Sequence, residues 1–182
     1  LIAAISGSGV SNNAAGPELA ELLGSLRAQK KLNQVTLKNE APALSYLPIA
    51  IRNAKLGPMI IRDLAKSFEK FADALPWYQR EEPALPEFMH GHANAFIVGP
   101  QGLEDWAGVV VGISILAPNI QYPDHSHPPR ELYVVMSSGD WRQDNNAWHS
   151  PGLGGLVYNP SNIRHSMRAG SEPLLAVWCL WT

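Results

Sequence analysis

Apolar side chains in the first half of the chain recur at intervals of three and four, the spacing of one face of an α-helix. A first helix is predicted from Pro17, because proline is favoured at a helix start, with the apolar stripe Leu19, Leu22, Leu23 and Leu26. Lys30 and Lys31 are expected in its last turn, where cations are favoured. A second helix is predicted over residues 58–75, with the apolar positions Ile60, Ile61, Leu64, Phe68, Phe71 and Leu75.

Two proline-containing segments connect these elements. Residues 38–57 contain Pro42, Pro48 and Gly57, and their pattern leaves a short helix and a strand both open. Residues 76–92 contain three prolines among acidic side chains, which is typical of a linker between two halves of a chain. The sequence therefore predicts an N-terminal helical extension over residues 1–92.

Beyond this extension the pattern changes to short runs of Val, Ile, Leu and aromatic residues bounded by Gly, Pro, Asn or Asp, which indicates β-strands. Strands are predicted over residues 95–98, 109–116, 132–137, 155–158 and 174–180. No helical period of useful length lies between them, so we expect antiparallel strands in a sandwich or barrel. Residues 93–182 are thus predicted to form a mainly β domain on which the helical extension packs.

Composition narrows the class of protein. The 182 residues suit one domain with an appended subdomain, and a formal net charge of −2 gives no basic surface for nucleic acid. The single cysteine, Cys179, cannot form an internal disulfide, so a reduced, cytoplasmic setting is expected. No run approaches the roughly 18 apolar residues of a membrane span. The chain does not begin with Met, and we expect its natural start to be missing.

The densest group of chemically active side chains lies in the β half. His125, His127, Glu131 and Tyr133 fall close together, and His165 follows later, after a turn sequence. Alternate residues of an extended chain share a face, so the two imidazoles point one way, and Glu131 and Tyr133 do the same beyond two prolines. Three imidazoles and a carboxylate suit one divalent metal with open positions; zinc, iron, manganese, cobalt and nickel all accept such ligands.

Two segments resemble the characteristic motifs of the cupin family. The first is matched by His125, His127, Glu131 and Gly139, with the glycine one residue later than usual. The second is matched by Gly154, Pro160 and His165, with Asn162 in place of a glycine and Ala169 in place of an asparagine. The resemblance covers residues 94–182. It implies a cupin double-stranded β-helix, a jelly-roll barrel, with a metal ion inside.

A narrower resemblance lies within the cupins. The run from His125 to Tyr133, the segment from Tyr158 to His165 and the helical extension are similar to the cupin-type dimethylsulfoniopropionate lyases. That family cleaves dimethylsulfoniopropionate, a small sulfonium zwitterion, to dimethyl sulfide and acrylate in marine bacteria. The resemblance implies that His125, His127, Glu131 and His165 are the metal ligands, and that Tyr133 is the base or a further ligand.

The chemistry of this reaction suits these residues. Removing a proton next to a carboxylate builds a second negative charge, which a bound metal would offset. A nearby dication also favours the phenolate of Tyr133, the expected base of a β-elimination. Aromatic faces bind a sulfonium at about 0.5–2 kcal/mol per contact. Tyr122 and, on the last strand, Trp178 or Trp181 are the predicted aromatic walls, and Tyr122 is also a catalytic candidate.

Two alternatives use the same fold. One is an iron-dependent cupin dioxygenase, and the other is a non-catalytic, metal-stabilised cupin that binds a small ligand. Lys55 and Arg62 are candidates for holding a substrate carboxylate, although charges on helices are ordinarily solvated. The oligomeric state stays open, because cupins pair through edge strands and nothing in the sequence demands or forbids such pairing.

Overall fold

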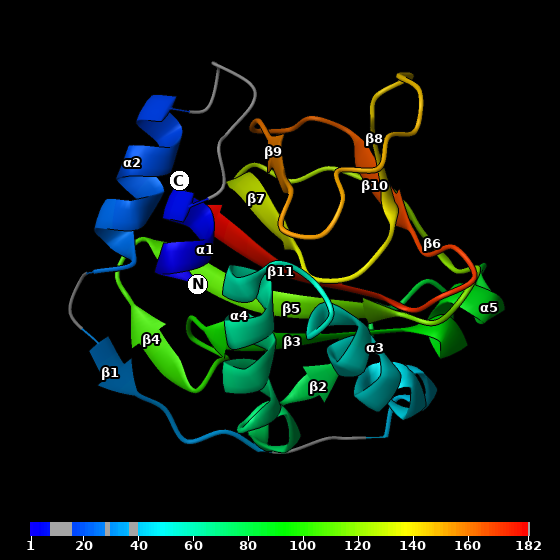
Figure 1. Ribbon diagram of the computed structural model, residues 1–182, viewed down its shortest axis with the longest axis horizontal. Coiled ribbons are helices and arrows are strands. Elements are labelled where there is room, and N and C mark those ends of the chain that lie inside the picture. The colour runs from blue at the N-terminus through cyan, green and yellow to red at the C-terminus, as the bar shows by residue number, and fades with distance from the viewer. Residues whose placement is uncertain (8–15, 28–29, 37–39, 182) are drawn as a thin grey trace.

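The computed structural model describes residues 1–7, 16–27, 30–36 and 40–181, and its strands form two sheets (Figure 1). The larger sheet has the order β1-β4-β3-β5-β11-β7-β9, with β2 paired to β3, and the smaller has the order β6-β10-β8. Pairing is antiparallel except for one bridge between β3 and β4. The strands are β1 (Lys30–Leu32), β2 (Trp77–Tyr78), β3 (His92–Val98), β4 (Glu104–Trp106), β5 (Val109–Leu116), β6 (Gln121–His125), β7 (Arg130–Val135), β8 (Asp140–Gln143), β9 (Leu156–Asn159), β10 (His165–Arg168) and β11 (Leu174–Trp181).

The central strands of the larger sheet are buried on both faces. On β5 and β11, residues such as Ile113 and Val177 join a core shared with the helices. Their alternates, such as Leu116 and Trp178, join a second core between the two sheets. Successive side chains of a strand point to opposite faces, so a continuous apolar run fills two cores at once. These strands therefore read as apolar runs rather than as an alternation of apolar and polar residues.

Helices cover the outer face of the larger sheet (Figure 1). They are α1 (Ile2–Gly7), α2 (Gly16–Ser25), α3 (Leu47–Ala54) and α4 (Met59–Glu69), with 3-10 turns η1 (Pro42–Tyr46) and η2 (Ala72–Ala74). The short helix α5 (Pro86–Gly91) instead packs Phe88 into the core between the two sheets. The stripe predicted for the second helix is confirmed, since Ile61 and Phe68 are buried in the helix–sheet core. The regular helix ends earlier than predicted, at Glu69, and η2 follows it.

Two local predictions need correction, and one open case is decided. Lys30 and Lys31 are not in a helix: α2 ends at Ser25, and both lysines belong to the edge strand β1, where pairing with β4 outweighs local preference. Residues 76–92 are more than a linker, because they contain β2 and α5. In the segment 38–57, where residues 38 and 39 lie outside the described part, the chain is helical as η1 and α3.

The five predicted strands are all present, but the smaller sheet was not predicted. Its strands β6, β8 and β10 are short and rich in polar side chains, so they carry no apolar run. Besides its helices, the N-terminal segment contributes the strands β1 and β2 to the larger sheet. The boundary between the helical extension and the β domain at residues 92/93 stays a prediction. Within the described ranges, every helix is too short or too polar to span a bilayer.

Candidate active site

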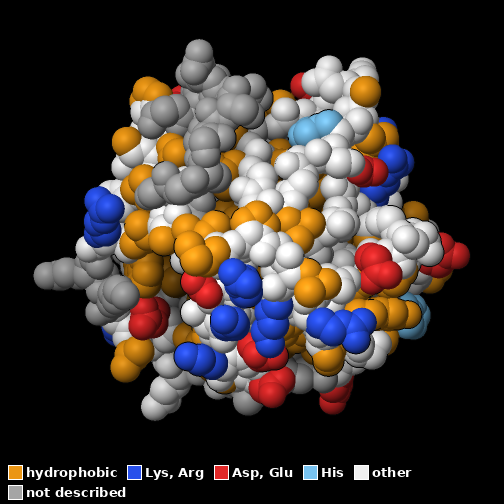
Figure 2. Space-filling view, in the orientation of Figure 1, with side chains coloured by type: hydrophobic (Ala, Val, Ile, Leu, Met, Phe, Trp, Pro, Cys, Tyr) orange, Lys and Arg blue, Asp and Glu red, His pale blue; other side chains and the backbone are white. Residues whose placement is uncertain are grey.

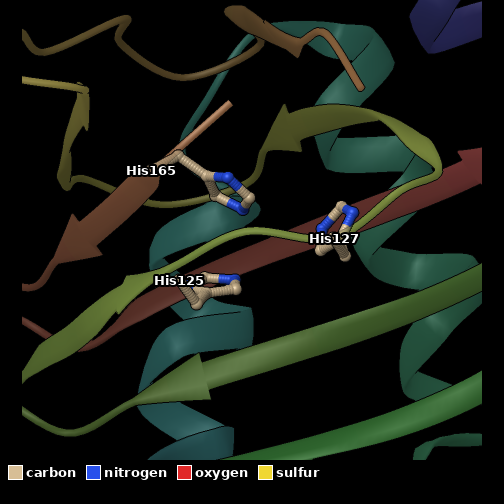
Figure 3. Close-up of side chains that lie close together, drawn as sticks. All are labelled: His125, His127 and His165. Carbon is tan, nitrogen blue, oxygen red and sulfur yellow. The ribbon is translucent and has the colours of Figure 1, made fainter. Parts of the chain in front are cut away.

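Three histidines from separate segments converge at the smaller sheet (Figure 3). His125 ends β6, His127 lies just beyond it, and His165 begins β10. Because β6 and β10 pair with His125 opposite His165, the antiparallel register brings the two sequence motifs together. One ring nitrogen of each histidine lies within 4.8 Å of the other two, an arrangement that could hold a metal ion.

The three imidazoles share one tautomer. Each Nδ1 lies 2.9 to 3.0 Å from a backbone carbonyl two residues away, those of Pro123, Pro129 and Ile163 in turn. A carbonyl only accepts a hydrogen bond, so each Nδ1 carries the proton and each Nε2 keeps its lone pair. Metal-ligating histidines are held in the same way. Among the described residues, the buried Nε2 of His165 has no hydrogen-bond partner, as expected of a nitrogen whose lone pair is available to a metal ion.

The charge states of these rings differ. Burial, together with the neighbouring His165, lowers the pKa of His125 to about 4. The nearby Glu131 carboxylate raises the pKa of His127 because it favours the protonated ring. His125 is therefore neutral at physiological pH, which is the form of imidazole that binds a metal.

Glu131 of β7 completes the cluster. Its Oε2 lies 3.0 Å from Nε2 of His165 and 3.6 Å from Nε2 of His127. Asn159 donates to the same oxygen at 2.8 Å, and Gln143 donates to the Asn159 amide oxygen at 2.7 Å. Burial alone would raise the pKa of Glu131, but its interactions with the two histidines and Asn159 outweigh burial and lower the pKa to about 2. The carboxylate is thus anionic and held against the imidazoles.

A cavity of about 330 Å³ opens beside this cluster. It is lined by Tyr122, Tyr133 and Trp178, together with His125, His127 and Glu131, whereas Trp181, the other predicted wall, does not line it. The sheet register explains the grouping: Tyr133 pairs with Trp178, and Trp178 pairs with Gly112 of β5, so their side chains share the inner face. The remaining lining residues are Tyr78, Arg80, Asn94, Phe96, Ser114, Ser126 and Leu180.

Trp178 is fixed at the wall of the cavity by polar and aromatic contacts. Its Nε1 donates to the Ser114 hydroxyl at 3.0 Å, and that hydroxyl donates to the Asn94 side-chain oxygen at 2.6 Å. Phe96 meets Trp178 edge to face at 5.5 Å, and Tyr78 stacks on Phe96 at 5.0 Å. The cavity therefore has an aromatic wall made by Tyr78, Phe96 and Trp178.

Two of the three phenols that line the cavity, those of Tyr133 and Tyr122, have different surroundings. Burial and the nearby Glu131 carboxylate raise the pKa of Tyr133 well above its ordinary value. Burial also raises the pKa of Tyr122, but the Arg80 guanidinium opposes that shift. The ring of Tyr122 lies 4.9 Å from that of His125. Both phenols are therefore neutral in the protein without a metal ion.

Sequence reasoning missed the half of the cavity that comes from β2, β3 and β5. Asn94 and Ser114 are polar residues inside apolar strands, and this signal could have identified them. Tyr78 ends the short β2 and Arg80 follows it, and no sequence pattern distinguishes them. Lys55 and Arg62 do not line the cavity, and Lys55 instead pairs with Glu69 on the helical surface at 2.5 Å.

Comparison with known proteins decides the family. A family profile described as dimethylsulfoniopropionate lyase matches residues 18–176. The chain belongs to the dimethylsulfoniopropionate lyase family. Its match runs from α2 to β11, so the helical extension and both sheets are part of what the family shares.

A curated relative has the same assignment. The chain is 26% identical over 142 residues to a Cereibacter sphaeroides protein provisionally named dimethylsulfoniopropionate lyase DddL. The match covers 78% of this chain and 59% of that relative. The chain thus spans less than two thirds of the length of the curated relative that it matches.

Two solved structures share the fold. DMSP lyase DddQ from Ruegeria pomeroyi DSS-3 superposes with a TM-score of 0.74 at 18% identity, over 100% of this chain and 91% of that one. A chain from the crystal structures of the DMSP lyases RdDddP and RnDddQII gives 0.75 at 18% identity, over 91% and 84%. The predicted cupin fold is confirmed, and so is the predicted family.

Proposed function

We propose that the protein cleaves dimethylsulfoniopropionate to dimethyl sulfide and acrylate by β-elimination. The observation that carries this proposal is one small cavity lined by His125 and His127 of the histidine cluster, by the phenols of Tyr122 and Tyr133 and by an aromatic wall, in a chain of the dimethylsulfoniopropionate lyase family. The substrate has a carboxylate at one end and a soft cation at the other, and the cavity offers groups suited to each.

His125, His127, Glu131 and His165 are the proposed ligands of one divalent transition metal. The shared tautomer with unprotonated Nε2 atoms, the unpartnered Nε2 of His165 and the anionic Glu131 all support this set. When bound, such an ion would offset the charge that builds on the substrate carboxylate and favour ionisation of a nearby phenol. Zinc, iron, manganese, cobalt and nickel remain the candidates.

Tyr133 is the proposed base. It shares the inner face of β7 with Glu131, and it removes the proton from the carbon next to the substrate carboxylate. The electrons of that C–H bond form the new double bond, the carbon–sulfur bond breaks towards sulfur, and dimethyl sulfide leaves uncharged. Because a neutral thioether departs, no acid is required at the leaving group.

Trp178 and Tyr122 are the proposed binding surfaces for the sulfonium, extended by Phe96 and Tyr78. Aromatic rings attract cations through the negative charge of their faces. The hydrogen bond from Trp178 to Ser114 holds the ring in place, so the wall is formed before the substrate arrives.

The decisive experiment is an anaerobic assay of the purified protein with dimethylsulfoniopropionate, before and after chelation and metal add-back. Headspace dimethyl sulfide that disappears with the chelator and returns with metal supports the lyase. An obligatory requirement for oxygen would instead support the dioxygenase. Metal binding with no turnover under any condition would support a non-catalytic, ligand-binding cupin.

A further inference from the structure

A cation that the sequence did not single out lines the same cavity. Arg80 lies two residues beyond Tyr78 of β2 and lines the space with His125 and Glu131. Its guanidinium carbon lies 5.6 Å from the centre of the Tyr122 ring. The side chain is 33% exposed, so it stands where the cavity meets solvent. Among the described lining residues, Arg80 is the one whose side chain is always positively charged.

The backbone of Arg80 is pinned by a buried histidine. The Arg80 N–H donates to Nε2 of His92 at 2.8 Å, while Nδ1 of the same ring lies 2.5 Å from the Phe88 carbonyl. His92 is fully buried and stacks on the Phe88 ring at 3.7 Å. Both ring nitrogens of His92 are bonded to the backbone, so the ring is not available to a metal ion. Its role is to fix where the Arg80 side chain starts.

The guanidinium keeps donors for an incoming anion. Among the described residues its charged partner is Glu82, at 3.5 Å, with both side chains about one third exposed. An ion pair of that length and exposure contributes little, so a substrate carboxylate can compete with it. Arginine presents several N–H groups in a planar fork that matches the two oxygens of a carboxylate.

We propose that Arg80 binds the substrate carboxylate and so selects substrates that carry an anion opposite the sulfonium. This inference rests on the proposed function. The guanidinium attracts the carboxylate and repels the sulfonium, which leaves the sulfonium to the wall of Tyr78, Phe96 and Trp178. The same charge adds to that of the metal at the end of the substrate where negative charge develops. A zwitterion therefore enters in one orientation.

The test uses two truncated analogues of the substrate with metal-loaded protein. 3-(Methylthio)propionate keeps the carboxylate and lacks the positive charge, whereas ethyldimethylsulfonium keeps the sulfonium and lacks the carboxylate. Arg80→Gln should weaken calorimetric binding of 3-(methylthio)propionate about tenfold or more and leave that of ethyldimethylsulfonium within about twofold. Arg80→Lys should fall between, since it keeps the charge and loses the fork. In steady-state assays, Arg80→Gln should raise KM more than it lowers kcat.

Arg142→Gln is the matched control. Arg142 also stacks on an aromatic ring, at 4.7 Å from Trp148, and pairs with an acid, but it does not line the cavity. The Arg142→Gln variant should bind both analogues as the unsubstituted protein does. The inference is wrong if Arg80→Gln binds 3-(methylthio)propionate as tightly as the unsubstituted protein does. It is also wrong if Arg80→Gln and Arg80→Lys, at normal metal content, both lose affinity for the two analogues to the same extent. The unsubstituted protein could bind 3-(methylthio)propionate through Arg80 and yet release no dimethyl sulfide from dimethylsulfoniopropionate. In that case the proposed function fails and the anion site stands.

Discussion

Trp178 lies directly across Gly112. A Cβ added at Gly112 would stand 2.0 Å from Cζ2 of Trp178, far inside van der Waals contact. The two residues are register partners on β11 and β5, and the missing side chain lets the indole lie flat along the sheet towards Phe96. The aromatic wall of the cavity therefore depends on a glycine in a neighbouring strand.

Gly112→Ala should displace Trp178 and destabilise the protein by about 1–3 kcal/mol, the usual cost of overpacking a core. It should also raise KM for the sulfonium substrate. Gly24→Ala is the control, because Gly24 lies in α2 and a Cβ there meets nothing within 4 Å. Urea unfolding of both variants checks this. A Gly112→Ala protein as stable and as active as the original would show that the wall tolerates a shifted indole.

Tyr133→Phe should lower kcat by about 10²- to 10⁴-fold, the contribution usual for a general base, while the protein keeps its metal. Tyr122→Phe is the paired variant, since it removes the phenol that lies beside His125 in the same cavity. If Tyr122 serves only as a binding surface, its loss should change KM more than kcat. Steady-state kinetics with metal analysis distinguish the two variants. A large loss of kcat in Tyr122→Phe and not in Tyr133→Phe would assign the base to Tyr122.

Asn159→Leu should weaken metal binding about 10- to 100-fold, as loss of a group that holds a ligand commonly does. The Asn159 amide donates to Glu131 and accepts from Gln143, so leucine leaves the Glu131 carboxylate without that support. Asn162→Leu would be a poor comparison, because Asn162 has φ of 61°. Ser161→Ala, which removes an exposed hydroxyl bonded to the Pro128 carbonyl, is the better control. Competition with a fluorescent chelator measures the affinity.

Stability should fall in acid partly through His92. Burial lowers the pKa of His92 to about 4, so between pH 6.5 and 4 the unfolded chain binds a proton that the folded protein does not. The free energy of unfolding should therefore decrease by about 2 kcal/mol from this residue between pH 7 and pH 5. Chemical denaturation at both pH values measures it.

His92→Gln should reduce that pH dependence, whereas His149→Gln should not, because His149 is exposed. His125 also has a lowered pKa and contributes equally to all three proteins. The same difference between pH 7 and pH 5 in all of them would contradict a neutral, buried His92.

The proposed metal ligands could be predicted because they are close in sequence or carry a motif. His125, His127, Glu131 and Tyr133 alternate along one stretch, and strand geometry alone places alternate side chains on one face. The departure at Asn162 is also explained, since asparagine tolerates the positive φ that the usual glycine would adopt there. Arg80 could not be predicted, because its place depends on the pairing of β2 with β3 and on a hydrogen bond to His92.

The sequence by itself determined the helical stripe of α4, the long apolar strands and the set of groups that can hold a cation, because each depends on local periodicity or on side-chain chemistry. Only the tertiary structure decided that His165 stands opposite His125, that Trp178 crosses Gly112 and that Arg80 reaches the same cavity. Register between strands arises from the packing of two sheets and two cores, and no short window of sequence contains it.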